Sequence, residues 1–577
     1  MILLTVIVPP DSFPSPEKYL HIIDSYLGTT ILSLCQPSKE RCYNAQNRVF
    51  LPCYFYNSAR HLKGRGCIMI RIAKTENGMV RGLPAADPRV TAFKGIPFAS
   101  PPVGENRWRA PQPCADWDGV HEAYAFAPIS VQDTPGLGTD IYCREWHVDP
   151  EIPMSEDCLY LNVWTNAKGT EDHLPVLVWF FGGALQWGYT AEMEMDGERL
   201  ARRGVVVVTV NYRLASLGFM AHPEITRNQP DAPANFGNLD QQAGLRWVVR
   251  NISAFGGDPT NITIAGQSAG GFSVMSQMAC LANAGLFQKA IVMSGMFRSP
   301  YEQDSFVTPK TLQQAEQEGE DFFALLGVLG LDEARSLDVY FIREKYAEYA
   351  KDHPRFATIL DGQFCAENPY HAFLKNQRVR VPVLSGNTAD EFMSYIQASD
   401  EADLAARAKA LFGESAYQFL SLPKIQERRP EGYAPVSMIE CAVKAAFLAE
   451  QKADQPNPCY YYRFDPEIPG EDKAGSFHSV DLWFFFETLA KCTRPFRGKH
   501  YDLARQMCNY WANFIKTGDP NGKDDDGEEL PVWRHYTGND PAEMLFVDEG
   551  AKPSDENSAF TRFMTQQIYK DIVGKDL

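Results

Sequence analysis

The feature that most constrains this chain is an apolar, β-prone run that leads directly into a Gly-x-Ser-x-Gly turn. Residues 262–272 read Ile-Thr-Ile-Ala-Gly-Gln-Ser-Ala-Gly-Gly-Phe. The pattern predicts a strand that turns sharply into a helix at Ser268. Gly266, Ala269 and Gly270 stand where backbone segments come too close for bulky side chains. Such a bend holds the Ser268 hydroxyl out at the end of a sheet, with a backbone N–H beside it.

Strand-like and helical segments alternate around this turn. Continuous apolar stretches at 174–181 and 204–210 predict strands that are covered on both faces, and shorter ones follow at 290–294 and 381–385. Residues 239–251 have helical spacing. This alternation predicts an α/β fold with a large, mostly parallel sheet flanked by helices.

Two regions, 301–375 and 400–455, are richer in charge, and we expect them to be helical insertions that cap the sheet. The first 68 residues differ from the rest, with four cysteines and no long periodic pattern. We therefore divide the chain into an N-terminal extension of unclear role, 1–68, and a main domain, 69–577. A zinc site on those cysteines and a native start at Met69 are alternatives, although the cysteine spacing is wide and uneven.

Composition narrows the functional class. Of 577 residues, 45% are hydrophobic and 22% charged, which is typical of an enzyme with a large core. A formal charge of −18 argues against nucleic acid as a partner. No run of about 18 apolar residues predicts a membrane span. The start lacks a basic signal-peptide region, and 13 scattered cysteines indicate reduced thiols. We expect a cytoplasmic monomer or small homo-oligomer, with secretion as the alternative, and no cofactor or metal.

A serine hydroxyl is a weak nucleophile and needs a base, a group that orients the base, and oxyanion donors. Gly182-Gly183-Ala184 follows a predicted strand and suits the donors, Asp390-Glu391 follows another, and His478 lies in a Gly/Ser loop. Taken singly, each has a plain structural alternative. Gly182-Gly183 could be a simple turn, Asp390-Glu391 a solvated acidic pair, and His478, one of 11 histidines, a capping or core residue. Their order along the chain is the order of an α/β-hydrolase.

Several longer segments resemble the type-B carboxylesterase family, which includes para-nitrobenzyl esterases and cholinesterases. The most distinctive is Ser155-Glu-Asp-Cys-Leu-Tyr-Leu-Asn-Val-Trp164. Phe93-Lys-Gly-Ile-Pro-Phe-Ala99, Asn211-Tyr-Arg-Leu214 and Trp511-Ala-Asn-Phe-Ile-Lys-Thr-Gly-Asp-Pro-Asn521 match as well. The resemblance runs from about 77 to 570 and implies an α/β-hydrolase fold. It also implies that 69–577 is the catalytic domain.

The resemblance implies a role for each candidate residue. Ser268 becomes the nucleophile, His478 the general base and acid, and Glu391, rather than Asp390, the carboxylate that orients His478. The family's three oxyanion donors fall on the backbone N–H groups of Gly183, Ala184 and Ala269. The implied activity is hydrolysis of small-molecule carboxylic esters through an acyl-enzyme, with a rate that rises between about pH 6 and 8 as the imidazole loses its proton.

The chain departs from the family pattern near the site. Gln267 replaces the usual glutamate before the serine, which lowers the expectation of quaternary ammonium substrates. Ala184 replaces a frequent glycine and narrows the oxyanion hole, and Phe392 replaces a glycine after the acid. No cysteine stands at the position of the usual disulfide partner of Cys158, so we expect Cys158 to be a reduced core thiol.

Aromatic residues near the motifs favour small to medium apolar or aryl esters. Such residues could line an acyl or alcohol pocket, although for each one taken singly core packing is the favoured role: Phe181, Trp187, Phe297 and Trp483. Two rival functions remain. A non-catalytic scaffold of the same fold is disfavoured because all three triad positions are filled. A triglyceride lipase is disfavoured because 135–155 is rich in charge where an apolar lid would be expected.

Overall fold

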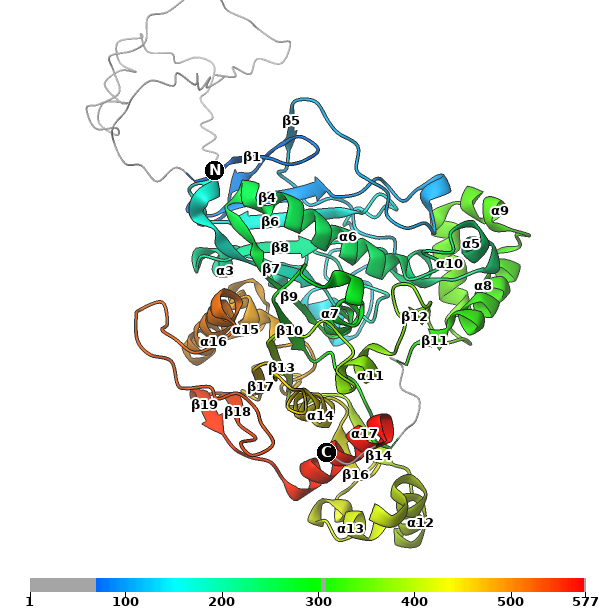
Figure 1. Ribbon diagram of the computed structural model, residues 1–577, viewed down its shortest axis with the longest axis vertical. Coiled ribbons are helices and arrows are strands. Elements are labelled where there is room, and N and C mark those ends of the chain that lie inside the picture. Colours follow the sequence, from blue (N-terminus) through cyan, green and yellow to red (C-terminus); the bar gives the residue numbers. More distant parts are fainter. Residues whose placement is uncertain (1–68, 302–307, 575–577) are drawn as a thin grey trace, which may run out of the picture. The chain divides into compact units, whose positions relative to one another are not determined.

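The computed structural model describes residues 69–301 and 308–574, so the predicted extension 1–68 lies outside the described residues. A single 11-stranded sheet organises the described chain (Figure 1). In spatial order its strands are β19 (Gly550–Ser554), β18 (Glu543–Val547), β17 (Cys459–Phe464), β13 (Val383–Thr388), β10 (Lys289–Met293), β9 (Gly257–Gln267), β7 (Leu174–Phe180), β8 (Val206–Val210), β6 (Tyr160–Thr165), β4 (Thr91–Pro97) and β3 (Leu83–Pro84).

The middle of this sheet is parallel. Every neighbouring pair from β8 to β18 is parallel, whereas β6, β4 and β3 at one edge and β19 at the other are antiparallel. All five residues of β8, Val-Val-Val-Thr-Val, are buried. Strands buried on both faces need such continuous β-branched runs. The prediction of a mostly parallel sheet flanked by helices is confirmed.

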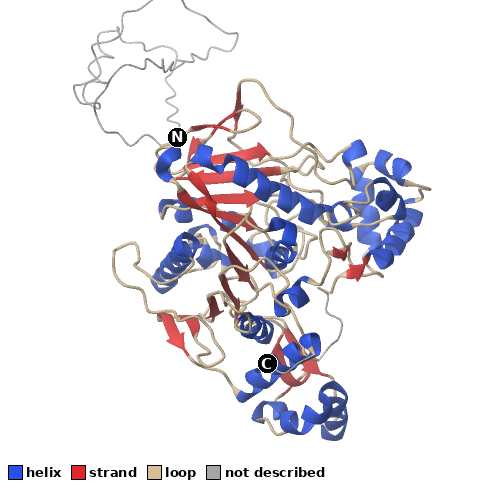
Figure 2. Cartoon of the chain, in the orientation of Figure 1, coloured by secondary structure: helices blue, strands red, loops and turns tan. Residues whose placement is uncertain are grey.

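Alternate residues of β7 pack into different cores on the two faces of the sheet. Val178 belongs to the core that contains Trp247 of α6 (Phe236–Asn251), and α7 (Ala269–Ala279) covers the same face. Trp179 belongs to the core that contains Trp511 of α16 (Gly498–Thr517), with α3 (Glu198–Arg202) beside it. Figure 2 shows the resulting arrangement, with the strands in the middle and helices on both sides.

The two charged regions are mostly helical, as predicted. Their helices are α8 (Leu312–Leu326), α9 (Leu331–Ser336), α10 (Val339–Tyr349), α11 (Pro369–Leu374), α12 (Glu401–Phe412), α13 (Ala416–Leu420) and α14 (Glu440–Glu450). The prediction missed a small antiparallel sheet of β14 (Met393–Ile396), β16 (Gly432–Ser437) and β15 (Arg428–Arg429). Strands β14 and β16 pair across about 40 residues, β15 is only two residues long, and runs this short carry little periodicity of their own.

The remaining elements are short or peripheral. An opening hairpin is formed by β1 (Ile72–Lys74) and β2 (Met79–Arg81), with β5 (Val120–Glu122) added beside β2. The others are α2 (Ile141–Glu145), α4 (Ala215–Phe219), α5 (Pro223–Asn228), β11 (Lys310–Thr311), β12 (Ile359–Leu360), α15 (Leu482–Phe485) and α17 (Ala559–Val573). None of the described helices is long and apolar enough to cross a bilayer. Cys158 is a buried free thiol, as expected.

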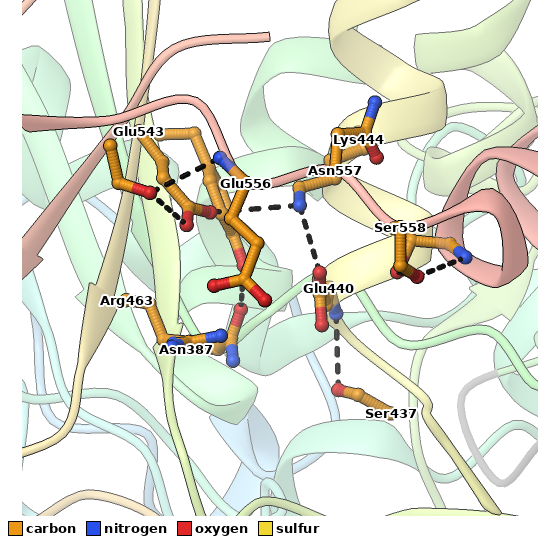
Figure 3. A network of polar contacts seen from close by, with 12 residues as sticks. Asn387, Ser437, Glu440, Lys444, Arg463, Glu543, Glu556, Asn557 and Ser558 are labelled. Carbon is orange, nitrogen blue, oxygen red and sulfur yellow. Dashed lines mark hydrogen bonds and ion pairs between the residues drawn. The ribbon is translucent and has the colours of Figure 1, made fainter. Parts of the chain in front are cut away.

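A buried polar network joins the C-terminal helices to the sheet (Figure 3). Nζ of Lys444 on α14 lies 2.8 Å from Oε1 of Glu440 and 3.6 Å from Oε2 of Glu543 on β18. Burial by itself lowers the pKa of Lys444, but these two carboxylates outweigh it and raise that pKa above its ordinary value. The cation is therefore retained in the interior, where it fixes α14 against β18. Helix α14 also packs on β13, the strand that leads to Glu391.

Candidate active site

Ser268 occupies a strained bend between β9 and α7. Its backbone has φ 56° and ψ −126°, a conformation that residues other than glycine rarely adopt. The bend is held because the Ser268 N–H donates to the Met293 carbonyl at 2.9 Å. A Cβ at Gly266 would lie 2.3 Å from the Gly270 carbonyl oxygen, and one at Gly270 would lie 2.1 Å from that of Phe180. The small residues of the motif are thus required by the close approach of three backbone segments.

The Glu391 carboxylate reaches the His478 ring from the end of β13. Nδ1 of His478 lies 2.6 Å from Oε2 of Glu391, and the Thr388 hydroxyl donates to Oε1 at 3.0 Å. Burial alone would raise the pKa of Glu391, but His478 and the Thr388 hydroxyl outweigh it and hold that pKa below its ordinary value. The carboxylate therefore stays ionised and fixes the proton of the ring on Nδ1, which leaves Nε2 free to accept a proton.

Asp390, the other acidic candidate, has a different partner. Its carboxylate accepts from the Ser476 N–H at 2.8 Å, and its own N–H donates to the Ser476 carbonyl at 3.1 Å. These two bonds fasten the loop that carries Glu391 to the loop that carries His478. Asp390 thus positions the two loops without touching the ring.

Two free N–H groups follow β7 in the glycine loop. Gly183 has φ 95° and Ala184 has φ 54°, so the chain turns through left-handed conformations. Among the described residues, neither N–H of this pair donates to a protein acceptor. The third candidate donor, the Ala269 N–H, belongs to the first residue of α7, where no intrahelical acceptor exists. Ala184 holds its conformation at a cost of about 1–2 kcal/mol relative to glycine.

These groups converge on one cavity of about 540 Å³, a volume suited to a small ligand. Its lining includes five of the six predicted site residues, Gly183, Ala184, Ser268, Ala269 and His478. Glu391 lies behind the histidine. The Ser268 hydroxyl and the ring share the cavity without a direct hydrogen bond, and Nε2 of His478 lies 3.3 Å from Nε2 of Gln267. Catalytic hydrogen bonds are often loose before substrate binds.

The cavity wall is aromatic, although two of the expected aromatic residues are elsewhere. Trp187 and Phe297 line the cavity, together with Phe272 and Phe392. The Phe392 ring centroid lies 4.7 Å from that of His478. The other two pack in the core, the role that is favoured for each residue taken singly. Phe181 stacks on Tyr212 at 4.3 Å, and Trp483 is fully buried in the core behind the wall. Phe392 has an ordinary negative φ, as its replacement of glycine requires.

Sequence reasoning missed two polar residues of the wall, Glu192 and His147. Glu192 follows the glycine loop, and His147 follows α2. A usable signal existed in the repeat Glu192-Met-Glu194, because two acidic residues follow the oxyanion loop so closely. No candidate metal cluster of three or more His, Cys, Asp or Glu residues occurs within 69–301 or 308–574.

Comparison with known proteins agrees with this geometry. The family model described as "Carboxylesterase family" matches residues 70–564. Para-nitrobenzyl esterase of Bacillus subtilis (strain 168) is 33% identical over 476 residues, 78% of this chain and 91% of the relative. Cholinesterase of Mus musculus is 30% identical over 510 residues, 80% of this chain and 81% of the relative.

Solved structures give the same result. A PNB esterase aligns with TM-score 0.67 and 29% identity, covering 86% of this chain and 99% of that structure. The carboxylesterase of Geobacillus stearothermophilus aligns with TM-score 0.65 and 28% identity, covering 86% and 100%. The chain therefore belongs to the carboxylesterase family, with the α/β-hydrolase fold, and is a carboxylic ester hydrolase.

Proposed function

We propose that Ser268 is the nucleophile of this hydrolase, that His478 is its general base and acid, and that Glu391 orients the imidazole. The observation that carries the proposal is the 2.6 Å contact between Nδ1 of His478 and Glu391, on a ring that faces the same cavity as the strained Ser268. A base held in one tautomer beside an exposed hydroxyl is the arrangement that nucleophilic catalysis requires.

The reaction proceeds in two steps. Nε2 of His478 takes the Ser268 proton as the oxygen attacks the ester carbonyl, and the C–O bond to the alcohol breaks as His478 returns that proton to the leaving oxygen. Water then attacks the acyl-enzyme by the same route. The N–H groups of Gly183, Ala184 and Ala269 face the oxyanion in both steps, and loss of one such donor typically costs about 3 kcal/mol of barrier.

Small to medium apolar or aryl esters suit the cavity best. Its aromatic wall and its volume of about 540 Å³ support this preference. A lipase function has less support because a lipase would need an apolar lid over the cavity. The helix in that region, α2, is only five residues long, and the charged residue before it, Asp140, is exposed. A chain-length series of p-nitrophenyl esters, with and without emulsified substrate, tests the preference. Faster turnover of emulsified long-chain esters would contradict it.

Labelling with a fluorophosphonate followed by peptide mapping tests the nucleophile. We expect the label on Ser268 and loss of label and turnover in Ser268→Ala. Ser276→Ala is the matched control, since Ser276 lies on the same helix and donates to the Phe272 carbonyl at 3.0 Å outside the cavity. A label on any other serine would overturn the assignment.

We also propose a cytoplasmic location. The nine cysteines among the described residues are all free thiols, which supports a reducing compartment. Alkylation of the denatured, unreduced protein from its native source should modify all 13 cysteines. Disulfide-linked peptides in that sample would favour secretion instead.

A further inference from the structure

Two buried glutamates stand directly after the glycine loop. Glu192 is 4% exposed and Glu194 is fully buried, on either side of Met193. Burial of an ionised carboxylate is costly unless it is paired. No arginine or lysine forms an ion pair with either carboxylate among the described residues. So unusual a pair calls for an explanation beyond packing.

The two carboxyls are close enough that a charge on Glu192 disfavours a second charge on Glu194. Burial raises the pKa of Glu192 to about 8 and raises that of Glu194 further, because a second charge beside Glu192 is also unfavourable. Both oxygens of Glu194 are buried without a hydrogen-bond partner among the described residues. Glu194 is therefore held as a neutral acid behind Glu192.

Glu192 is the member of the pair that meets the substrate cavity. It lines the cavity that contains Ser268, as does its neighbour His147. Its Oε1 accepts from the Tyr189 N–H at 3.2 Å and lies 2.7 Å from Nδ1 of His147. A carboxylate offers about four acceptor positions. Tyr189 and His147 both lie at Oε1, and among the described residues no hydrogen bond reaches Oε2, so Oε2 remains a free acceptor for a group in the cavity.

The other carboxylates of this cavity are already engaged nearer the solvent. Asp133 accepts from Nε1 of Trp187 at 3.1 Å, and exposed Asp140 accepts from the Cys143 N–H at 3.0 Å at the start of α2. Buried Tyr212 lies behind Glu192. Glu192 is thus the carboxylate that a substrate group meets inside the apolar cavity, where charge-assisted hydrogen bonds are strongest.

We propose that Glu192, with Glu194 behind it, forms a subsite for a protonated primary or secondary amine carried on one arm of the ester substrate. The proposal rests on the proposed function, since it places the amine in the Ser268 cavity. An N–H of the ammonium occupies the free acceptor position, and the proton that Glu192 carries at neutral pH passes to solvent. A trimethylammonium group has no N–H to donate, so it cannot form this hydrogen bond to Glu192.

Two ester series of equal length test the subsite. One consists of p-nitrophenyl esters whose acyl chains end in a methyl, hydroxyl, primary amine or trimethylammonium group. The other consists of benzoates of alcohols with the same four ends. Only the arm that extends to Glu192, acyl or alcohol, can place its amine there, so one of the two series should show the preference. In that series kcat/KM for the amine-ended ester should exceed kcat/KM for the methyl-ended ester by about ten-fold or more, the effect of a hydrogen bond to a charged group. In Glu192→Gln that ratio should fall to about one.

Asp133→Asn is the matched control because it removes a carboxylate from the same cavity and keeps the acceptor for Trp187. Its amine-to-methyl ratio should match that of the wild type. Three outcomes would each overturn the subsite. The amine-to-methyl ratio could fall as much in Asp133→Asn as in Glu192→Gln, or it could stay unchanged in Glu192→Gln. Esters with trimethylammonium or hydroxyl ends could also gain as much in kcat/KM as the amine-ended ester.

Inhibition of the wild-type enzyme provides a test that needs no variant. Hexylamine should inhibit turnover of a methyl-ended ester more strongly than hexyltrimethylammonium or hexanol, and the reverse order would contradict the subsite. Failure of the proposed function has a different signature. In that case Ser268 would escape the fluorophosphonate, whereas failure of the subsite alone leaves the label in place and removes only the preference for amines.

Discussion

Substitution of Asp481 by asparagine should stabilise the protein at alkaline pH and much less at acid pH. Asp481 is fully buried beneath His478, at the start of α15. One carboxyl oxygen accepts from the Tyr462 hydroxyl at 2.8 Å, and the other has no hydrogen-bond partner. Burial, reinforced by the charge of Glu391, raises the pKa of Asp481 from 3.8 to about 7. Asparagine keeps an acceptor for Tyr462 and removes the charge.

The size of the effect follows from the raised pKa. The folded protein holds the Asp481 proton more tightly than the unfolded chain does, so this group stabilises the fold at low pH. That stability is lost as pH rises from about 4 through about 7. At about 1.4 kcal/mol per pKa unit, the wild type loses about 3 kcal/mol between pH 4.5 and pH 8, and the variant does not.

Thermal unfolding at the two pH values measures the difference. For about 500 ordered residues the unfolding entropy is about 1 kcal/mol/K, so the advantage of Asp481→Asn should grow by about 3 °C from pH 4.5 to pH 8. Exposed Asp231→Asn is the control and should show no such growth. An equal difference in Tm at both pH values would refute the argument, because it would mean that Asp481 has an ordinary pKa.

Three further substitutions test the catalytic geometry. Glu391→Gln should lower kcat by about 10³–10⁴-fold with the fold intact, because the glutamine amide no longer holds the ring proton of His478 on Nδ1. A loss of kcat below about ten-fold in steady-state kinetics would contradict the orienting role. Ala184→Gly should raise the free energy of unfolding in urea by up to about 1 kcal/mol. The strain of about 1–2 kcal/mol at φ 54° is relieved, and the larger backbone entropy that glycine loses on folding offsets part of the gain. A lower free energy of unfolding than that of the wild type would show that the strain is absent. Gln267→Glu places a carboxylate where the Gln267 amide lies, 3.3 Å from Nε2 of His478. Because this negative charge favours the protonated imidazole, the acid limb of the pH–rate profile should move to higher pH by about one unit. An unmoved limb would show that the two groups do not interact in the active enzyme.

The sequence predicts the framework of the site because that framework depends on local patterns. Buried strands require continuous β-branched runs, and the bend at Ser268 requires small neighbours, so both are visible in single segments. The predicted parallel sheet brings the carboxyl ends of β9 and β13, and with them Ser268 and Glu391, to one edge. The choice between Asp390 and Glu391 needed the family resemblance.

What the sequence does not predict depends on contacts between distant segments. The clamp between Asp390 and Ser476 joins two loops 86 residues apart. The exclusion of Phe181 from the cavity follows from its stacking on Tyr212, and the closeness of Gln267 to His478 follows from how the side chains pack. None of these contacts leaves a periodic or compositional signal in its own segment.

Gln267 and the Glu192–Glu194 pair together decide where negative charge lies on the cavity wall. Gln267 removes a negative charge from the residue before the nucleophile, where it would face Nε2 of His478. The Glu192–Glu194 pair places a titratable carboxyl on another part of the same cavity wall, backed by a neutral acid instead of a cation. A charge beside His478 acts on the base in every turnover, whereas a charge at Glu192 acts only on substrates that extend to it. The arrangement therefore separates recognition of the substrate from tuning of the base, which a single glutamate at position 267 would couple.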